Sequence, residues 1–104
     1  MACKQPSAKT LAKYGLTHRS WSDYAEYGNY VCWICKKLPK SGRLHIDHEH
    51  VKGWKKLPPH SRRLYVRGLA CFRCNSQFMR RGLTLELAKA VVDYLQRYDS
   101  TGEL

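Results

Sequence analysis

The sequence predicts a small α+β domain stabilised by zinc, and three observations carry this prediction. Two C-x-x-C pairs, Cys32/Cys35 and Cys71/Cys74, have the spacing typical of a four-thiolate tetrahedral zinc site. Short strand-like runs bounded by turn residues lie between the pairs, and stretches with helical periodicity lie on both sides of them. At 104 residues the chain has little room for a large core, and a structural metal is a common source of stability at this size.

The first stretch of the chain is polar and then helical. Residues 1–10 are expected to be a flexible basic N-terminus, with Cys3 a free thiol outside both pairs, and residues 11–104 a single zinc-bound domain. A helical turn over 11–14 ends at Gly15, and Thr17 caps a helix over 18–27. The apolar face of this helix is expected to pack on the zinc module rather than stack on bases; it consists of Trp21, Tyr24 and Ala25.

A hairpin with a long loop is expected between the cysteine pairs. Residues 43–47 form the first strand, with Leu44 and Ile46 on one face, and residues 64–67 form the second. The loop between them contains Pro58 and Pro59, which are expected to exclude a regular helix there.

Two helices are expected after the second cysteine pair. The first covers residues 73–81 and stops at Gly82, and the second covers 85–98 with Thr84 as its cap. The second carries an apolar stripe, for which core packing is expected and a homodimer contact is the alternative. The stripe consists of Leu87, Val91, Tyr94, Leu95 and Tyr98.

The charge of the chain favours a nucleic-acid partner. The formal net charge is +11, from 19 Lys and Arg against 8 Asp and Glu, which suits binding to a phosphate backbone such as that of DNA. No apolar stretch approaches 18 residues, and neither a basic amphipathic helix nor a lipidation motif indicates a membrane partner. Without a signal peptide the thiols are expected in a reducing cytoplasm, where they bind metal.

An Asp-His dipeptide between the cysteine pairs, and an Asn directly after the last cysteine, indicate chemistry beyond a structural zinc site. Asp47 offers a hard oxygen ligand for Mg²⁺, and Asn75 offers an amide oxygen to the same ion. His48 is the candidate general base, because its ordinary pKa lies near neutrality. His50 is expected to orient phosphate or contact the metal. Neighbouring residues on a strand point to opposite sides, so Asp47 and His48 act on one phosphate only if the strand ends there.

The loop after the Asp-His pair is the most basic part of the chain. We give equal weight to two interpretations of this loop, a nucleic-acid contact and a merely solvated surface. A charge run is usually only solvated, but here a tryptophan and two prolines are interleaved with the cations. The candidate DNA-binding residues are Lys52, Trp54, Lys55, Lys56, Arg62 and Arg63, together with Arg67 on the second strand.

At these positions the chain resembles a known family. The runs from Leu44 to His50 and from Val66 to Asn75 are similar to the phage recombination endonuclease VII family of HNH, or His-Me finger, nucleases. The resemblance implies a ββα-metal core, zinc on the four cysteines and a catalytic Mg²⁺ or Mn²⁺ held by Asp47 and Asn75. It also implies His48 as general base, cleavage of branched, Holliday-junction-like DNA, and action in the host-cell cytoplasm if a phage encodes the chain.

Two departures from the family pattern keep other functions open. The loop from Lys52 to Arg63 is longer and more basic than expected, and the chain ends soon after its last helix, whereas larger members form intertwined dimers. A homing-type HNH endonuclease that nicks or cuts duplex DNA is therefore an alternative. A catalytically silent zinc module that binds nucleic acid is another, although such a module has no use for Asp47, His48 and Asn75 together.

Overall fold

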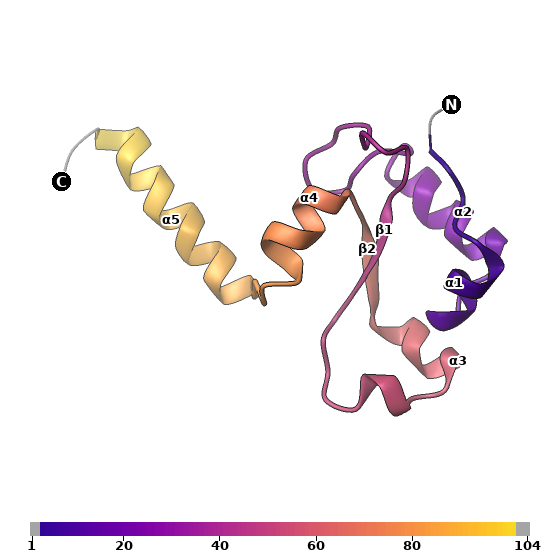
Figure 1. The fold of residues 1–104 in the computed structure, drawn as a ribbon. Helices are drawn as coiled ribbons and strands as arrows, with labels where there is room; N and C mark the ends of the chain where they lie inside the picture. Colours follow the sequence, from indigo (N-terminus) through magenta and orange to yellow (C-terminus); the bar gives the residue numbers. More distant parts are fainter. Residues whose placement is uncertain (1–2, 102–104) are drawn as a thin grey trace.

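A two-stranded antiparallel sheet lies at the centre of a small α+β fold in the computed structural model, which describes residues 3–101 (Figure 1). Strand β1 covers His45–His48 and β2 covers Val66–Ala70, with His45 opposite Ala70. Both strands were expected, and each begins two residues later than predicted. The residues before β2, Arg63–Tyr65, instead form a 3-10 turn, η2.

The N-terminal helices lie against one side of the hairpin (Figure 1). Helix α1 covers Ala8–Lys13 and α2 covers His18–Tyr27, the range predicted for it. The Thr17 hydroxyl accepts a hydrogen bond from the Ser20 N–H, and the Ser20 hydroxyl accepts one from the Thr17 N–H. This reciprocal capping satisfies two backbone N–H groups that a helix start otherwise leaves unpaired.

The hydrophobic core forms where α2 packs on the sheet. The predicted packing of α2 is confirmed, because Trp21 and Ala25 are buried and Tyr24 is half-buried against them. Leu44 and Ile46 are buried on the face predicted for them. Cys3 is a free thiol, as predicted, but it packs partly buried against the core rather than in a frayed end; Met1 and Ala2 lie outside the described residues.

The long loop between the strands contains short helical segments. These are a 3-10 turn η1 over Trp54–Lys56 and a helix α3 over Pro59–Arg62. The expectation that the prolines exclude helix here is wrong for α3. Pro59 occupies the first helical position, where the missing N–H has no intrahelical partner to lose. Gly15 lies against the Pro59 carbonyl with no space for a side chain, which brings the α1–α2 turn close to α3.

A helix follows directly on β2. Helix α4 covers Phe72–Cys74 and continues as a π-helical turn, η3, over Asn75–Met79, where the Arg80 N–H donates to the Asn75 carbonyl at 2.8 Å. The helix predicted over 73–81 is therefore present with a wider last turn, and the chain reverses at Gly82, whose φ is +81°.

The C-terminal helix α5, Leu85–Thr101, extends away from the rest of the molecule (Figure 1). The core packing expected for its apolar stripe is wrong in this chain: Leu87, Val91, Tyr94 and Leu95 are 45–72% exposed, and the side chain of Tyr98 lies outside those described. The radius of gyration is 16.0 Å, whereas a compact domain of this length has about 13 Å. Within residues 3–101, no helix combines the length and apolarity that crossing a membrane requires.

Candidate active site and metal centre

The four cysteines of the two C-x-x-C pairs meet at one point. Their Sγ atoms all lie within 4.8 Å of one another, and those of Cys35 and Cys71 are 3.9 Å apart. A tetrahedral zinc ion with Zn–S distances of about 2.3 Å would separate its sulfurs by about 3.8 Å. The cluster therefore fits a structural zinc ion with little rearrangement.

Backbone hydrogen bonds prepare this cluster to hold a cation. The N–H groups of Ile34 and Cys35 donate to Cys32 Sγ at 3.3 and 3.5 Å, and the Cys74 N–H donates to Cys71 Sγ at 3.4 Å. Burial raises the pKa of Cys32, but hydrogen bonds from the backbone N–H groups of Cys35, Cys71 and Ile34 and from the Cys35 thiol lower it more, so that the pKa falls to about 7. A thiolate, the form that binds metal, is thus accessible near neutral pH at Cys32, whereas burial raises the pKa of Cys74 to about 12.

The cluster also sets the position of the hairpin and its following helix. Cys71 directly follows β2, and Cys74 lies in α4 immediately before Asn75. On the other side, the Trp33 N–H donates to the Leu69 carbonyl of β2 at 3.0 Å. The Trp33 indole packs against Gly68, where a Cβ atom would collide with its ring. Metal at the cysteines would therefore fix Asn75 relative to β1 and β2.

Asp47 is a buried carboxylate with a cationic partner. Its exposed fraction is 7%, and Arg67 donates to it through two bonds, Nε to Oδ2 at 2.8 Å and a terminal nitrogen to Oδ1 at 3.0 Å. The strand register shifts here, since Asp47 pairs with Gly68 and His48 with Val66. Arg67 is thus the extra residue of a β-bulge, a feature that commonly redirects a side chain near a functional site. Arg67, predicted to bind DNA, contacts Asp47.

His48 ends β1, so the strand stops at the Asp-His pair as the predicted site requires. Its imidazole stacks on the Trp54 indole with ring centroids 4.1 Å apart and 20° between the planes. The rings of Tyr14 and His50 lie 5.6 and 5.0 Å from it. Tyr14 was not singled out from the sequence, because nothing in the sequence indicates that α1 reaches the end of β1.

The surroundings of His48 favour its neutral form. Burial lowers the pKa of His48, and repulsion from His50, Arg67 and Lys13 adds to this effect, while attraction to Asp47 opposes it. A histidine that accepts a proton must first be neutral, so the direction of this shift suits a general base.

Trp54 and Arg62 are engaged within the protein. Trp54 is 8% exposed, with His48 on one side and the Arg62 guanidinium 4.6 Å from its ring centroid. Arg62 in turn donates to the carbonyls of Lys13 at 3.0 Å and Lys55 at 2.7 Å. The Trp54 ring is therefore not presented to stack on a base, contrary to the sequence-based expectation. The other predicted DNA-binding residues of the loop are exposed: Lys52, Lys55, Lys56 and Arg63.

Asn75 is half-buried at the start of η3, a segment in contact with β1. Its side-chain amide makes no hydrogen bond within residues 3–101. Across the same range, the cysteines are the only group of three or more Cys, His, Asp or Glu side chains that converge closely enough to hold a metal. Any second metal near Asp47 would consequently have at most two Cys, His, Asp or Glu ligands from the described residues and depend on an amide, water or phosphate for the others.

Comparison with known proteins identifies relatives. A family model described as recombination endonuclease VII matches residues 7–97. The "Gene 59 protein" of Mycobacterium phage L5 is 30% identical over 90 residues, which cover 86% of this chain and 44% of that protein. The chain thus spans less than half the length of this curated relative. No solved structure matches the chain significantly.

Proposed function

Because the chain belongs to the recombination endonuclease VII family, we propose that it is a metal-dependent DNA endonuclease that hydrolyses phosphodiester bonds. One observation carries the proposal beyond the family: His48, with a lowered pKa, directly follows the buried Asp47 where the hairpin is bulged and β1 ends. The formal net charge of +11 suits a DNA substrate.

In this proposal β1, β2 and the α4–η3 helix form a ββα-metal core of the HNH, or His-Me finger, type. The four cysteines hold a structural zinc ion that joins the hairpin to the helix. Support for this role comes from chain order, since Cys71 and Cys74 stand between β2 and Asn75.

The catalytic Mg²⁺ or Mn²⁺ would be held by Asp47 and Asn75. Each Asp47 oxygen accepts one bond from Arg67 and keeps a further lone pair, and the Asn75 amide is free of hydrogen bonds within the described residues. One carboxylate, an amide and several waters suit Mg²⁺, which takes few protein ligands. When bound, the ion would neutralise charge on the phosphate and on the leaving 3′ oxygen.

His48 would act as the general base. A nitrogen of its imidazole accepts a proton from water while the water oxygen forms a bond to phosphorus and the bond to the 3′ oxygen breaks. The leaving oxygen takes a proton from solvent, which gives a 3′-hydroxyl and a 5′-phosphate. His50, 5.0 Å away between ring centroids, is placed to orient the phosphate.

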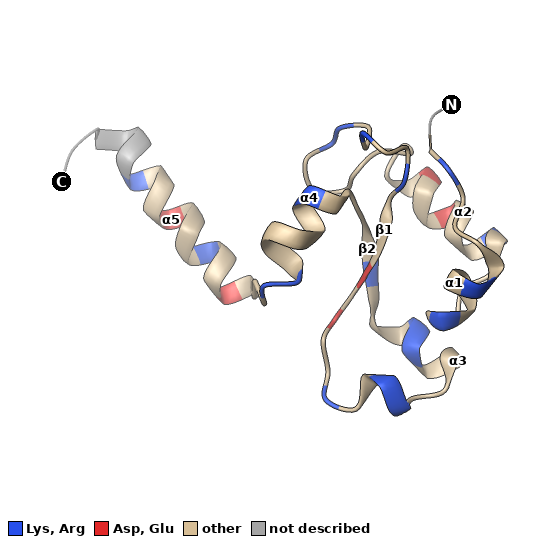
Figure 2. Ribbon diagram, viewed as in Figure 1, with Lys and Arg blue, Asp and Glu red and all other residues tan. Residues whose placement is uncertain are grey.

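Cations around the site would hold the DNA backbone. Figure 2 shows Lys and Arg in the loops at both ends of the hairpin. Those predicted to contact DNA and exposed in the structure are Lys52, Lys55, Lys56, Arg63 and, through the free part of its side chain, Arg67.

We also propose that the chain forms a homodimer. This proposal rests on the exposed apolar side chains of α5.

A cleavage assay tests the proposal. The zinc-loaded protein is incubated with Mg²⁺ and with four-way-junction, nicked and linear duplex DNA of matched sequence. We expect cleavage that requires the divalent ion, with junction DNA cut fastest. Equal rates on all three substrates would favour a homing-type nicking enzyme, and binding without cleavage of any substrate would favour a silent zinc module.

A further inference from the structure

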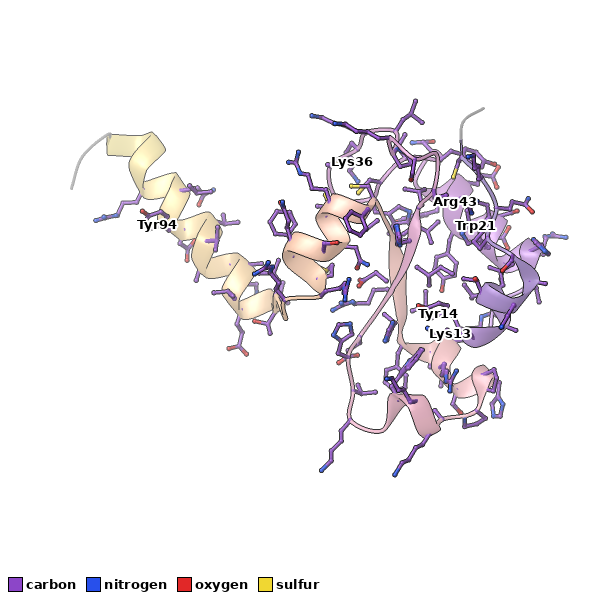
Figure 3. All side chains as sticks on the ribbon, viewed as in Figure 1. Lys13, Tyr14, Trp21, Lys36, Arg43 and Tyr94 are labelled. Atoms are coloured by element: carbon purple, nitrogen blue, oxygen red, sulfur yellow. The ribbon has the colours of Figure 1, made fainter. Side chains whose placement is uncertain are left out.

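A cavity of about 590 Å³ opens between the loop after the first cysteine pair and the start of α4. Its lining includes His45, so it lies where β1 begins, at the opposite end of that strand from His48. Lys36 and Arg43 mark the two ends of this loop; in Figure 3, Lys36 is labelled near the start of α4 and Arg43 on the other side of the hairpin, toward α2. The volume is within the range of small-molecule sites, about 300–1,000 Å³.

One wall of the cavity is apolar and exposed. Phe72 is 62% exposed and Leu38 is 57% exposed, and both line the cavity together with Pro39. The ring of His45 lies 5.7 Å from that of Phe72 at a tilt of 53°, so it supports the phenyl ring from the sheet side. An aromatic ring held in this way, with most of its surface in solvent, is suited to stacking on another flat ring.

The rim of the cavity is basic. Lys37, Lys40, Arg43 and Arg73 line it, no Asp or Glu does, and within residues 3–101 none of the four cations forms an ion pair. A zinc ion on four thiolates would add a formal charge of −2 nearby through Cys35 and Cys71, which would offset two of the four cations. The remaining excess is positive, so a ligand should combine a flat ring with a negative group.

We propose that this cavity binds one unpaired nucleotide of the DNA substrate, with its base on Phe72 and its phosphate among the four cations. The inference rests on the proposed function and specifies its substrate. Only an unstacked base offers a face to a protein ring, so the cavity would favour DNA with a flap, branch or opened end over intact duplex.

The distance along β1 sets where this nucleotide would lie. From His45 to His48 the strand rises by about 10 Å, three residues at about 3.3 Å each. The bound nucleotide should therefore lie about 10 Å, along the direction of β1, from the phosphate that His48 addresses.

Binding of two DNA probes tests the inference. The probes are a duplex with a four-nucleotide single-stranded flap and the same duplex without it, and the zinc-loaded protein is titrated by fluorescence anisotropy without Mg²⁺, so that no cleavage occurs. We expect the wild type to prefer the flap. In Phe72→Ala and Phe72→Leu, the ratio of affinity for the flap probe to affinity for the plain duplex should fall by about 5- to 150-fold, the range expected for the loss of one stacked base.

Matched controls separate this role from a structural one. Phe78→Ala removes another exposed phenylalanine outside the cavity and should keep the flap preference. Phe72→Tyr should keep it too, because the ring remains. Lys37→Gln with Lys40→Gln should weaken flap binding at unchanged zinc content.

Three results would overturn the inference. These are a wild type without flap preference, the same preference in wild type and Phe72→Leu at full zinc content, or wild-type flap binding by the lysine variant. The last result would mean that the cations only balance the thiolates. Because cleavage is not measured, failure of the nuclease proposal would leave this test intact, and an active nuclease could still fail it.

Discussion

The indole of Trp54 lies nearly parallel to the imidazole of His48, with ring centroids 4.1 Å apart. Arg62 covers the indole at 4.6 Å and is itself fixed by the carbonyls of Lys13 and Lys55. The proposed general base is therefore held by a chain of contacts that leads back to α1. The orientation of His48 depends on Trp54 and Arg62, which contact neither metal nor DNA in the proposed mechanism.

Replacement of Trp54 should affect turnover more than DNA binding. We expect Trp54→Leu to lower the cleavage rate at saturating DNA by about ten- to a hundred-fold, since small displacements of a catalytic group have effects of this order. Trp54→Phe keeps a flat ring against His48 and should retain most of the rate. A Trp54→Leu protein with normal zinc content, a normal thermal midpoint and wild-type turnover would contradict the positioning role.

Removal of one zinc ligand should unfold the domain. Cys71→Ser should lower both zinc content and the thermal midpoint steeply, because structural zinc contributes on the order of 10 kcal/mol to folding. Cys3→Ser is the matched control, since Cys3 lies outside the cluster and should keep one zinc per chain. Retention of the wild-type melting curve by the metal-free protein would show that zinc is not structural.

The exposed cations of the strand-connecting loop should account for part of the salt dependence of DNA binding. Replacing Lys52, Lys55, Lys56 and Arg63 together by Ala should flatten the slope of log K against log salt by about two to four units, at about 0.9 for each phosphate contact. Arg62 is left in place because it supports Trp54. The control is Lys9→Ala with Lys89→Ala, on α1 and α5, which should keep the wild-type slope. An unchanged slope in the loop variant would mean that the DNA contacts lie elsewhere.

The apolar side of α5 should mediate self-association without stabilising the zinc-bound body. Figure 3 shows Tyr94 on the part of α5 that extends from the body. We expect Val91→Glu with Leu95→Glu to shift the sedimentation coefficient from dimer to monomer while the thermal midpoint of the body changes little. A wild type that sediments as a monomer at micromolar concentration would rule out the dimer.

Local rules predicted much of the fold. The Thr17 cap, the bounds of α2 and the buried face of Leu44 and Ile46 depend on near neighbours in the sequence, and the structure confirms them. The convergence of the four cysteines follows from the geometry that their spacing implies, and it is confirmed as well.

The sequence pattern could not predict contacts between residues far apart in the chain. The basic loop around Trp54 has the composition of a DNA-binding segment. Only the structure, in which α1 and α3 approach each other, shows that the Trp54 ring is covered. The periodic stripe of α5 predicts an amphipathic helix but not what lies against it. Pro59 was taken to prevent a helix, although at a first helical position it is compatible with one.

We propose that His48 is the general base of a metal-dependent DNA hydrolysis. The most direct test is the single-turnover cleavage rate of zinc-loaded wild type, His48→Ala and His18→Ala at saturating protein with Mg²⁺. We expect cleavage by the wild type and by His18→Ala, which alters an exposed histidine on α2, and a rate about 10²- to 10⁴-fold lower for His48→Ala at unchanged DNA affinity. Cleavage by His48→Ala at nearly the wild-type rate would contradict it.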